Sequence, residues 1–431
     1  MALNYLFIAF FVLSFLLCCI KAAIGIFLPT YSFGDVEVFS KAVESTFDLA
    51  KVGVTISLGY IGAFSLWLGL MKVGEKGGVI KQMSKFASPL FKHLFPEVPK
   101  NHPAFGSMMM NISANMLGLD NAATPMGLRA MDDLQSLNVQ KENATNSQIM
   151  FLVLNTSGLT IIPLSIMILI SEISEGQLNP TEYFLPILLT TFCSTMAGVF
   201  VVSYIQKLKL YTKPVVWLYF FGIAVFMTLL MLAYLGFNEQ NRLVFTSIFG
   251  GSVILGFMTW FVVAGARKKI NVYDIFIEGA KEGFGTAVKI IPFLVGILVA
   301  IGLFRVSGGL GLLTDAIGFI ITSVGGDAQI AEALPTAFTK PFSGSGARGM
   351  MVETINNQIA QADGDIVKGM TSIPSRMVAL MQGSTETTFY VLAVYFGSVG
   401  IKNTRYAVGV SLFADFIGLI AAIGFTYLFF G

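Results

Sequence analysis

Residues 111–129 read NISANMLGLDNAATPMGLR, which is the pattern of a helix that breaks and starts again. Asn111 and Asn115 are four residues apart and therefore share one face of the first helix. Gly118 can end this helix, and Asn121 or the aspartate before it can cap the next one. Inside a membrane the open backbone of such a break needs protein or a polar cavity around it, because lipid offers no hydrogen bonds. The alternative is an ordinary capped loop at the surface.

A second stretch of this kind reads LPTAFTKPFSGSGARGMM at residues 334–351. Its small residues, 343–346, leave backbone amides and the N-terminus of the next helix open to a ligand, and Arg348 adds a positively charged guanidinium nearby. These donors suit an anionic or carbonyl-rich ligand. Alternatively, Arg348 anchors a helix C-terminus or Glu353. The glycine spacing also matches a dinucleotide fingerprint, but no strand or βαβ unit surrounds it, which argues against that interpretation.

The composition of the chain indicates a membrane protein. Of its 431 residues 55% are hydrophobic and 12% are charged, whereas an ordinary soluble domain has roughly 25% charged residues. Apolar runs of about 20 residues with short loops between them leave no segment for a separate soluble domain. The net charge of +2 comes from Lys and Arg spread along the loops, so the sequence predicts no nucleic-acid partner.

Nine apolar runs are long enough to predict membrane spans. They lie at about 4–28, 52–71, 148–170, 183–205, 214–236, 245–266, 285–304, 375–397 and 405–430. Two long intervals, 72–147 and 305–374, interrupt this series, and they contain the two stretches quoted above.

Each interval begins with an amphipathic stretch that suits a helix lying in the membrane interface. Apolar residues from Val79 to Leu94 recur at helical spacing with lysines between them, and a similar stripe runs from Leu310 to Val324. Both halves then read in the same order: two spans, an interfacial helix, a broken pair of short helices and two more spans. An internal duplication is the simplest explanation.

Positive charge predicts how the two halves cross the membrane. Basic loops at 207–213 and 267–269 are separated by two spans, so both loops are expected in the cytoplasm, as is the N-terminus. One linking span at 214–236 then gives the second half the opposite orientation to the first. We therefore predict an all-α polytopic membrane protein of about nine transmembrane helices in two inverted repeats, each with a broken re-entrant helix pair.

Glu386 lies near the middle of a predicted span, among the hydroxyl side chains of residues 384–388. Placing an ionisable group in a membrane span costs free energy, so the group should face the interior of the bundle with a partner. A functional role is therefore favoured. The alternative is a structural buried pair with Lys340, Arg348 or Arg376. Residues 155–157 occupy the related place in the first half, where Ser and Thr more often mediate helix packing.

Cysteine and histidine give no sign of a metal site or of catalysis. Cys18, Cys19 and Cys193 lie in apolar runs without ligand spacing, and neither His93 nor His102 has a second ligand or a nucleophile nearby. The sequence therefore predicts no enzyme, no metal and no cofactor.

The two broken regions carry a family resemblance. Residues 111–131 resemble spore maturation protein A, and residues 334–353 with 382–390 resemble spore maturation protein B, so the chain looks like a fusion of the two. Both families contain a nucleoside-recognition or Gate domain, which also occurs in concentrative nucleoside carriers and in the membrane part of ferrous-iron transport protein B. The resemblance implies transport or gating through inverted re-entrant hairpins. It implies a first Gate repeat at 1–210, a linking helix at 211–240 and a second Gate repeat at 241–431.

These observations predict a secondary transporter of a small polar or anionic solute, such as a nucleoside-like or other organic metabolite, working by alternating access. The alternative is an ion-permeation gate or a non-transporting scaffold in an envelope complex. The residues predicted to bind the solute are Asn111, Asn115, Asn121, Thr124, Ser343, Ser345, Gly346, Arg348, Gln382, Thr385, Glu386 and Thr387. The coupling ion, proton or sodium, stays open, as does a homo-oligomer. The lipid bilayer is an expected partner, in the cytoplasmic (inner) membrane of a bacterium.

Overall fold

The helices of the protein follow the order that the sequence predicts. The computed structural model describes residues 2–28, 30, 33–99, 101–117, 120–158, 160–323 and 325–431, apart from the side chains of 2–6, 120–122, 211, 239, 240 and 290. The helices are α1 (Ala2–Phe27), α2 (Val38–Gly77), α3 (Val79–Leu94), α4 (Pro103–Met116), α5 (Asp120–Ser136), α6 (Asn146–Thr156), α7 (Leu164–Ile173), η1 (Pro180–Tyr183), α8 (Phe184–Ile205), η2 (Leu210–Thr212), α9 (Pro214–Gly236), α10 (Glu239–Arg267), α11 (Val272–Val306), α12 (Gly309–Ser323), α13 (Gln329–Thr339), α14 (Gly344–Gln361), α15 (Ile366–Met370), α16 (Ile373–Ser384), α17 (Thr388–Ser398) and α18 (Ala407–Phe430).

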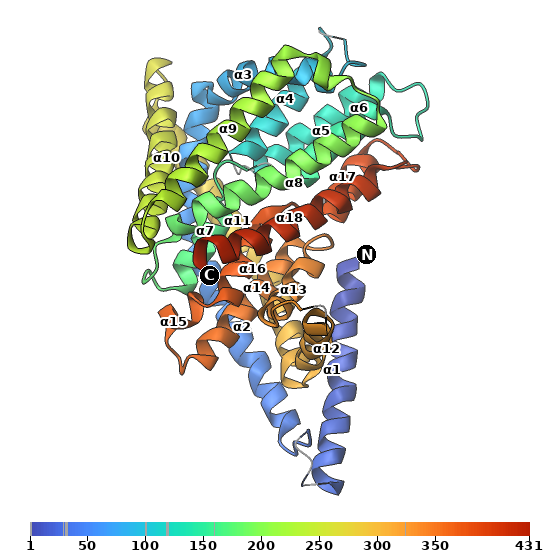
Figure 1. The fold of residues 1–431 in the computed structure, drawn as a ribbon, viewed down its shortest axis with the longest axis vertical. Helices are drawn as coiled ribbons and strands as arrows, with labels where there is room; N and C mark the ends of the chain where they lie inside the picture. Colours follow the sequence, from blue (N-terminus) through green and yellow to red (C-terminus); the bar gives the residue numbers. More distant parts are fainter. Residues whose placement is uncertain are drawn as a thin grey trace.

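The two halves of the chain contain the same series of elements. The first half has two long helices, α1 and α2, then α3, the pair α4 and α5, the pair α6 and α7, and α8 (Figure 1). After α9, the second half repeats this order with α10 and α11, α12, the pair α13 and α14, the pair α16 and α17, and α18, with the short α15 added. The all-α architecture with a broken pair in each half is therefore confirmed, whereas the domain bounds at 210 and 241 stay predictions.

The predicted count of nine spans is not confirmed. Within the described residues, seven helices are long and apolar enough to cross a membrane. The other two predicted spans, 148–170 and 375–397, are each interrupted. In the first, Gly158 has a φ of +65°, and Pro163 precedes the start of α7. In the second, Thr385 is extended, with φ −147° and ψ 174°. Hydropathy misses both interruptions because a few Ser, Thr and Gly residues barely lower the average of an apolar window.

Glycine lets the two longest helices, α2 and α11, approach closely along their length. A Cβ on Gly279 would lie 2.4 Å from the carbonyl oxygen of Leu68, and a Cβ on Gly283 would lie 2.4 Å from that of Phe64. Small residues four apart commonly bring helix backbones together in membranes, where association depends on close packing. The α8 helix packs against α18, where Ser194 Oγ donates to Ala414 O at 3.0 Å.

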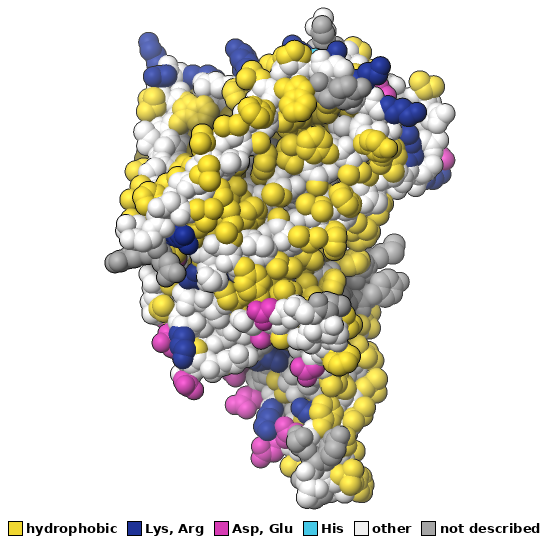
Figure 2. All heavy atoms as spheres, viewed as in Figure 1, with side chains coloured by type: hydrophobic (Ala, Val, Ile, Leu, Met, Phe, Trp, Pro, Cys, Tyr) yellow, Lys and Arg dark blue, Asp and Glu magenta, His cyan; other side chains and the backbone are white. Residues whose placement is uncertain are grey.

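Charge is distributed unevenly over the surface. Lys and Arg gather mostly at the upper end of the face in Figure 2, Asp and Glu gather mostly in its lower third, and hydrophobic side chains cover much of the area between. The α3 helix at the upper end has the predicted amphipathic character, with Val79, Phe91 and Leu94 buried and Lys81 and Lys85 exposed. This distribution is typical of a protein whose middle lies in a bilayer.

Candidate functional site between the two broken helices

Both predicted broken regions form helical hairpins. In the first, α4 begins at Pro103, where His102 Nδ1 accepts the Ala104 N–H at 3.2 Å. It ends at Met116 with Leu117 as its C-cap, and α5 begins at Asp120. In the second, α13 and α14 are joined by residues 340–343, and Ser343 Oγ accepts the Gly346 N–H at 2.9 Å as the cap of α14. We call these pairs hairpin 1 (α4 and α5) and hairpin 2 (α13 and α14).

Each hairpin is bound to the interrupted helix of its own half through the backbone. The Ile161 N–H, in the interruption between α6 and α7, donates to Met116 O of hairpin 1 at 2.7 Å. The Phe389 N–H, in the first turn of α17, donates to Pro341 O of hairpin 2 at 2.9 Å. Because these bonds join corresponding elements of the two halves, they extend the internal duplication from element order to individual contacts.

A small cavity of about 40 Å³ lies where the two interrupted helices meet hairpin 2. Its lining comes from the interruption between α6 and α7, from the first turn of α7 at 163–166, from hairpin 2, and from the end of α16 with the interruption that follows. The lining side chains with polar groups are Thr160, Ser165, Lys340, Arg348, Gln382, Thr385 and Glu386. Both halves of the chain therefore contribute to one polar site.

Two of the three charged side chains that line this cavity are basic. Lys340 is 7% exposed, and its ammonium donates to Gln382 O at 2.8 Å. Arg348 and Glu386 supply one further charge of each sign to the lining. The N-terminus of α7 also faces the cavity and has no side-chain cap, so its partial positive charge adds to that of the two basic residues.

Two polar atoms at this cavity are buried without a hydrogen-bond partner among the described residues: Gln382 Oε1 and Arg348 Nε. Gln382 is 2% exposed, and its amide nitrogen donates to Gly344 O at 3.4 Å. Buried polar groups in folded proteins nearly always have partners, including ordered water or a ligand. These two atoms are therefore suited to bind a polar species in the cavity.

Amide side chains form a second polar cluster, on the side of hairpin 1. Asn115 Nδ2 donates to Asn155 Oδ1 at 2.7 Å, and Asn111 Nδ2 donates to Ala123 O at 2.8 Å and to the Tyr395 hydroxyl at 3.3 Å. The Tyr395 hydroxyl also lies 3.5 Å from Asn155 Oδ1. Asn111 Oδ1 is buried with no hydrogen-bond partner among the described residues. This cluster connects hairpin 1 to α6 and α17.

The structure brings some of the predicted solute-binding residues together and separates others. Arg348, Gln382, Thr385 and Glu386 line the cavity, while Asn111 and Asn115 belong to the amide cluster. Ser343 Oγ is used by the cap of α14 and lies 3.3 Å from Ser345 Oγ, so the Gly346 amide is already bonded. Thr387 Oγ1 would lie 2.7 Å from a Cβ on Gly344, and Thr124 is half-buried on α5. The side chain of Asn121 lies outside the described residues.

The alternative partner considered for Arg348 is taken by another residue. Glu353 lies with its Oε1 2.7 Å from Nε of Arg305, so Arg305 and not Arg348 forms the buried ion pair with it. Arg376, considered as a partner of Glu386, lies with its guanidinium 4.1 Å from the centre of the Phe430 ring.

Sequence reasoning missed three residues of this region as site residues: Lys340, Tyr395 and Asp415. Asp415 lies in the predicted span 405–430, and its Oδ2 accepts a hydrogen bond from Thr388 Oγ1 at 2.7 Å, at the N-terminus of α17. Lys340 and Glu386 lie close enough to Asp415 to interact electrostatically with its carboxyl group. An ionisable residue in a span was the criterion for Glu386 and would have found Asp415 too.

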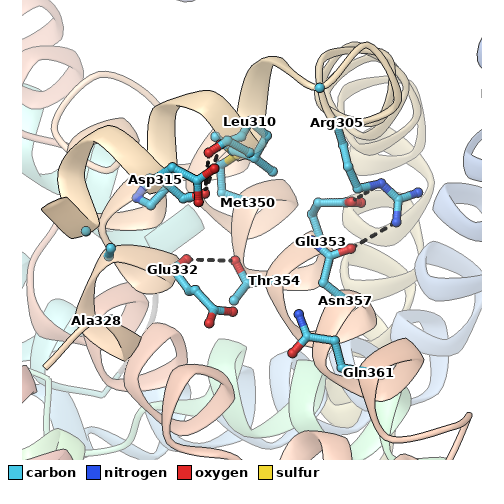
Figure 3. Close-up of a pocket in the computed structure, with 16 residues that line it drawn as sticks. Arg305, Leu310, Asp315, Ala328, Glu332, Met350, Glu353, Thr354, Asn357 and Gln361 are labelled. Atoms are coloured by element: carbon cyan, nitrogen blue, oxygen red, sulfur yellow. Dashed lines mark hydrogen bonds and ion pairs between the residues drawn. The ribbon is translucent and has the colours of Figure 1, made fainter. Parts of the chain in front are cut away.

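A larger cavity of about 600 Å³ lies between α11, α12 and hairpin 2 (Figure 3). Arg305, Asp315, Glu332 and Glu353 line it, and Arg305 Nη1 donates to Asn357 Oδ1 at 2.9 Å in addition to its pairing with Glu353. Only elements of the second half contribute to this cavity, and none of the predicted solute-binding residues lines it. We therefore place the candidate site at the smaller cavity between the two halves.

Comparison with known proteins agrees with this arrangement of two halves. The family model described as "Gate: Nucleoside recognition" matches the chain twice, at residues 57–173 and 287–402, which together make up more than half of its length. The chain is a multi-pass membrane protein of the Gate family.

It is similar to spore maturation protein B of Bacillus subtilis, with 44% identity over 167 residues, which cover 39% of this chain and 86% of that protein. It is also similar to spore maturation protein A of Bacillus subtilis, with 37% identity over 161 residues, which cover 37% of this chain and 81% of that protein. The chain is thus related to two separate proteins, as expected of a fusion.

Proposed function

We propose that this protein is a secondary transporter of a small anionic or carbonyl-rich solute, and that the cavity between the two interrupted helices is its binding site. One observation carries the proposal: Lys340, Arg348 and the uncapped N-terminus of α7 converge on one cavity. In the low dielectric of a membrane protein such a site strongly favours negative charge or carbonyl oxygens. The family description, which names nucleoside recognition, is compatible with a nucleoside-like or other organic metabolite.

The size of the cavity implies that the conformation described here is closed. A volume of about 40 Å³ has room for a few water molecules, whereas pockets for metabolites are usually about 300–1,000 Å³. Hairpin 2 supplies Lys340 and Arg348, so its withdrawal would open the cavity from one side. Hairpin 1 belongs to the other half and holds the opposite wall indirectly, because Met116 O accepts the N–H of Ile161 in the interruption between α6 and α7. Movement of hairpin 1 with this interruption would open the site from the side of the first half. Such alternation is the usual working mode of inverted repeats.

Glu386 is the candidate for coupling to an ion gradient. It supplies the one carboxylate among the described lining residues, against two basic side chains. Binding of a proton or of sodium at Glu386 would neutralise this carboxylate and strengthen the attraction for an anion. Ion and solute would then bind cooperatively, which is what symport requires.

The test is uptake into liposomes that contain the purified protein and carry an imposed proton or sodium gradient, with nucleosides, nucleotides and carboxylates as candidate solutes. We expect Arg348→Ala to lower uptake about tenfold or more, because a hydrogen bond to a charged group contributes about 1.5–3 kcal/mol. We expect Glu386→Gln to remove the dependence on the gradient. Lys209→Ala, in the exposed loop before α9, is the control and should behave as wild type. Wild-type uptake by both site variants at equal protein amounts would refute the proposal.

An ion-permeation gate is the second candidate, and the volume of the cavity favours it, since a partly dehydrated ion fits about 40 Å³ better than a metabolite does. A gate would give a conductance in planar bilayers and no solute accumulation in liposomes. Arg348→Ala would then change the selectivity between anions and cations, because fixed charges in a pore set its ion preference.

A further inference from the structure

A cavity of about 550 Å³ lies away from the proposed transport site, where the end of α2, the interfacial helix α3, hairpin 1 and the connection between α10 and α11 meet. Its polar side is formed by Lys81 and Lys85 of α3 and by Lys268, which follows α10. Glu75 is the one carboxylate among the described lining residues, so the lining has a net charge of +2.

The fold holds these three lysines on one side of the cavity. Lys81 and Lys85 are four residues apart and share a face of α3. Lys268 lies across the junction of α2 and α3, where its ammonium donates to Lys76 O at 3.3 Å. A Cβ on Gly78, which has a φ of +84°, would lie 2.7 Å from that ammonium, so the junction needs a glycine for Lys268 to lie there.

None of the ion pairs between described residues includes one of these three lysines. Lys72, one turn before Glu75 on α2, differs in this respect, since its ammonium lies 2.8 Å from Glu282 and 3.5 Å from Glu278. Among the described lining residues, the three lysines thus carry more positive charge than Glu75 balances.

The apolar part of the lining belongs mostly to hairpin 1. Phe105, Met109 and Met110 of α4 and Met126 of α5 form this part, and Met110 is 36% exposed. Gly106 also lines the cavity, and a Cβ on it would meet no atom within 4 Å, so there is open space beside it. The cavity therefore combines a basic side with a flexible apolar side, since methionine adapts to irregular partners.

We propose that this cavity binds one anionic phospholipid, with its phosphate against Lys81, Lys85 and Lys268 and an acyl chain against the methionines of hairpin 1. Interfacial helices such as α3 lie at the depth of the headgroups, and basic pockets between transmembrane helices bind acidic headgroups. A zwitterionic lipid lacks the net charge that the lysines require, and free phosphate leaves the apolar side empty. Lipid binding at this cavity requires no transport activity.

The test is a binding titration by native mass spectrometry of the full-length protein, freed of lipid in detergent. Phosphatidylglycerol is the probe, phosphatidylcholine with the same acyl chains tests the need for charge, and glycerol 3-phosphate tests the need for an acyl chain. We expect phosphatidylglycerol to bind at least about tenfold more tightly than either. Replacement of both α3 lysines in Lys81→Ala/Lys85→Ala should weaken its binding about 30-fold.

Two further variants separate this cavity from general surface charge. Gly106→Leu fills the open space without changing charge and should weaken phosphatidylglycerol binding at least about tenfold. Lys209→Ala/Lys213→Ala removes two exposed lysines elsewhere and should leave binding unchanged. The proposal is overturned if the two lipids bind equally, if glycerol 3-phosphate binds as tightly as phosphatidylglycerol, or if the control variant loses as much affinity as the α3 variant. An unchanged melting temperature of each variant shows that it has folded.

Discussion

The backbone N–H of Glu386 donates a hydrogen bond to the carbonyl oxygen of Thr156 at 2.9 Å, which joins the interruption of one helix to the interruption of the other. Each interruption frees backbone groups that a continuous helix would have paired, and here one half of the chain satisfies the other. The place where the helices break is therefore also the place where the two halves meet, and both halves contribute to the cavity beside it.

Substitution of Gly158 should destabilise the contact between the two interruptions. This residue has a φ of +65°, and its Cβ would lie 3.0 Å from the carbonyl carbon of Thr385. A left-handed conformation costs a residue with a side chain about 1–2 kcal/mol, and the contact adds to this cost. We expect Gly158→Val to lower the melting temperature of the purified protein by about 5 °C. Gly222→Ala, whose Cβ would meet no atom within 4 Å, should not lower it.

The hydrogen bond between Asn115 and Asn155 should appear as a coupling energy. At 2.7 Å it connects hairpin 1 to α6, and bonds between helices in membranes contribute about 0.6 kcal/mol on average and up to about 1.7 kcal/mol. A double-mutant cycle with Asn115→Ala, Asn155→Ala and the double variant, followed by thermal unfolding, should give a value in this range. Additive effects would mean that the two amides do not interact.

Two ion pairs between described residues differ widely in burial and should therefore differ in their effect on stability. Glu353 has a side chain 1% exposed, so Arg305→Ala leaves a buried charge and should cost about 3 kcal/mol, at the lower end of the usual range because Arg305 is 36% exposed. Lys402→Ala breaks the pair with Glu142, whose two side chains are 76% and 66% exposed, and should lower the free energy of unfolding by less than about 1 kcal/mol.

The pair can be checked further by rescue. Arg305→Ala/Glu353→Gln removes the buried charge together with its partner and should recover most of the lost melting temperature. Equal stability of the Arg305→Ala and Lys402→Ala variants would contradict the assignment of the first pair as buried.

Acidification should weaken the attachment of hairpin 2 to α18. The Gln329 N–H at 2.9 Å and the Tyr427 hydroxyl at 2.8 Å donate to Asp327 before the start of α13. These bonds hold the pKa of Asp327 below its ordinary value, the backbone bond being the larger cause. Because its pKa is lower in the folded state, the ionised Asp327 stabilises the folded protein at pH values above its unfolded-state pKa of about 3.9. This contribution is lost as the pH falls through the folded-state pKa.

Comparison of variants over pH isolates this contribution. Asp327→Asn should be less stable than wild type at pH 7, and the difference in melting temperature should shrink as the pH is lowered below about 4. Tyr427→Phe removes one of the two donors and should show a smaller difference with the same sign. A difference that grows on acidification would contradict the assignment.

Much of the architecture could be predicted from the sequence because membrane insertion imposes strong local patterns. The apolar runs, the amphipathic residues of α3 and the breaks after Leu117 and at 340–343 all lie at the predicted places. The interruptions within 148–170 and 375–397 were missed, since their Ser, Thr and Gly residues disturb hydropathy little. A local signal is nevertheless present, because the polar segments 155–160 and 383–388 occupy matching places in the two halves.

The candidate site was less predictable than the fold. Arg348 and Glu386 were singled out by chemistry, as a fixed cation beside small residues and as a carboxylate in a span, and they line the same cavity. Lys340 was considered only as a partner for Glu386, and its burial follows from packing between hairpin 2 and α16. The pairing of Glu353 with Arg305, 48 positions away in the chain, has no local signal at all.

The sequence by itself determined that this chain lies in a bilayer, that it consists of two related halves, and where each half opens its backbone, because hydropathy, glycine and helix caps act over a few neighbouring residues. Only the tertiary structure decided which of these open segments meet and which charged groups face one cavity. Some of those contacts join residues more than 200 positions apart, such as Thr156 and Glu386, and they depend on close packing of whole helices.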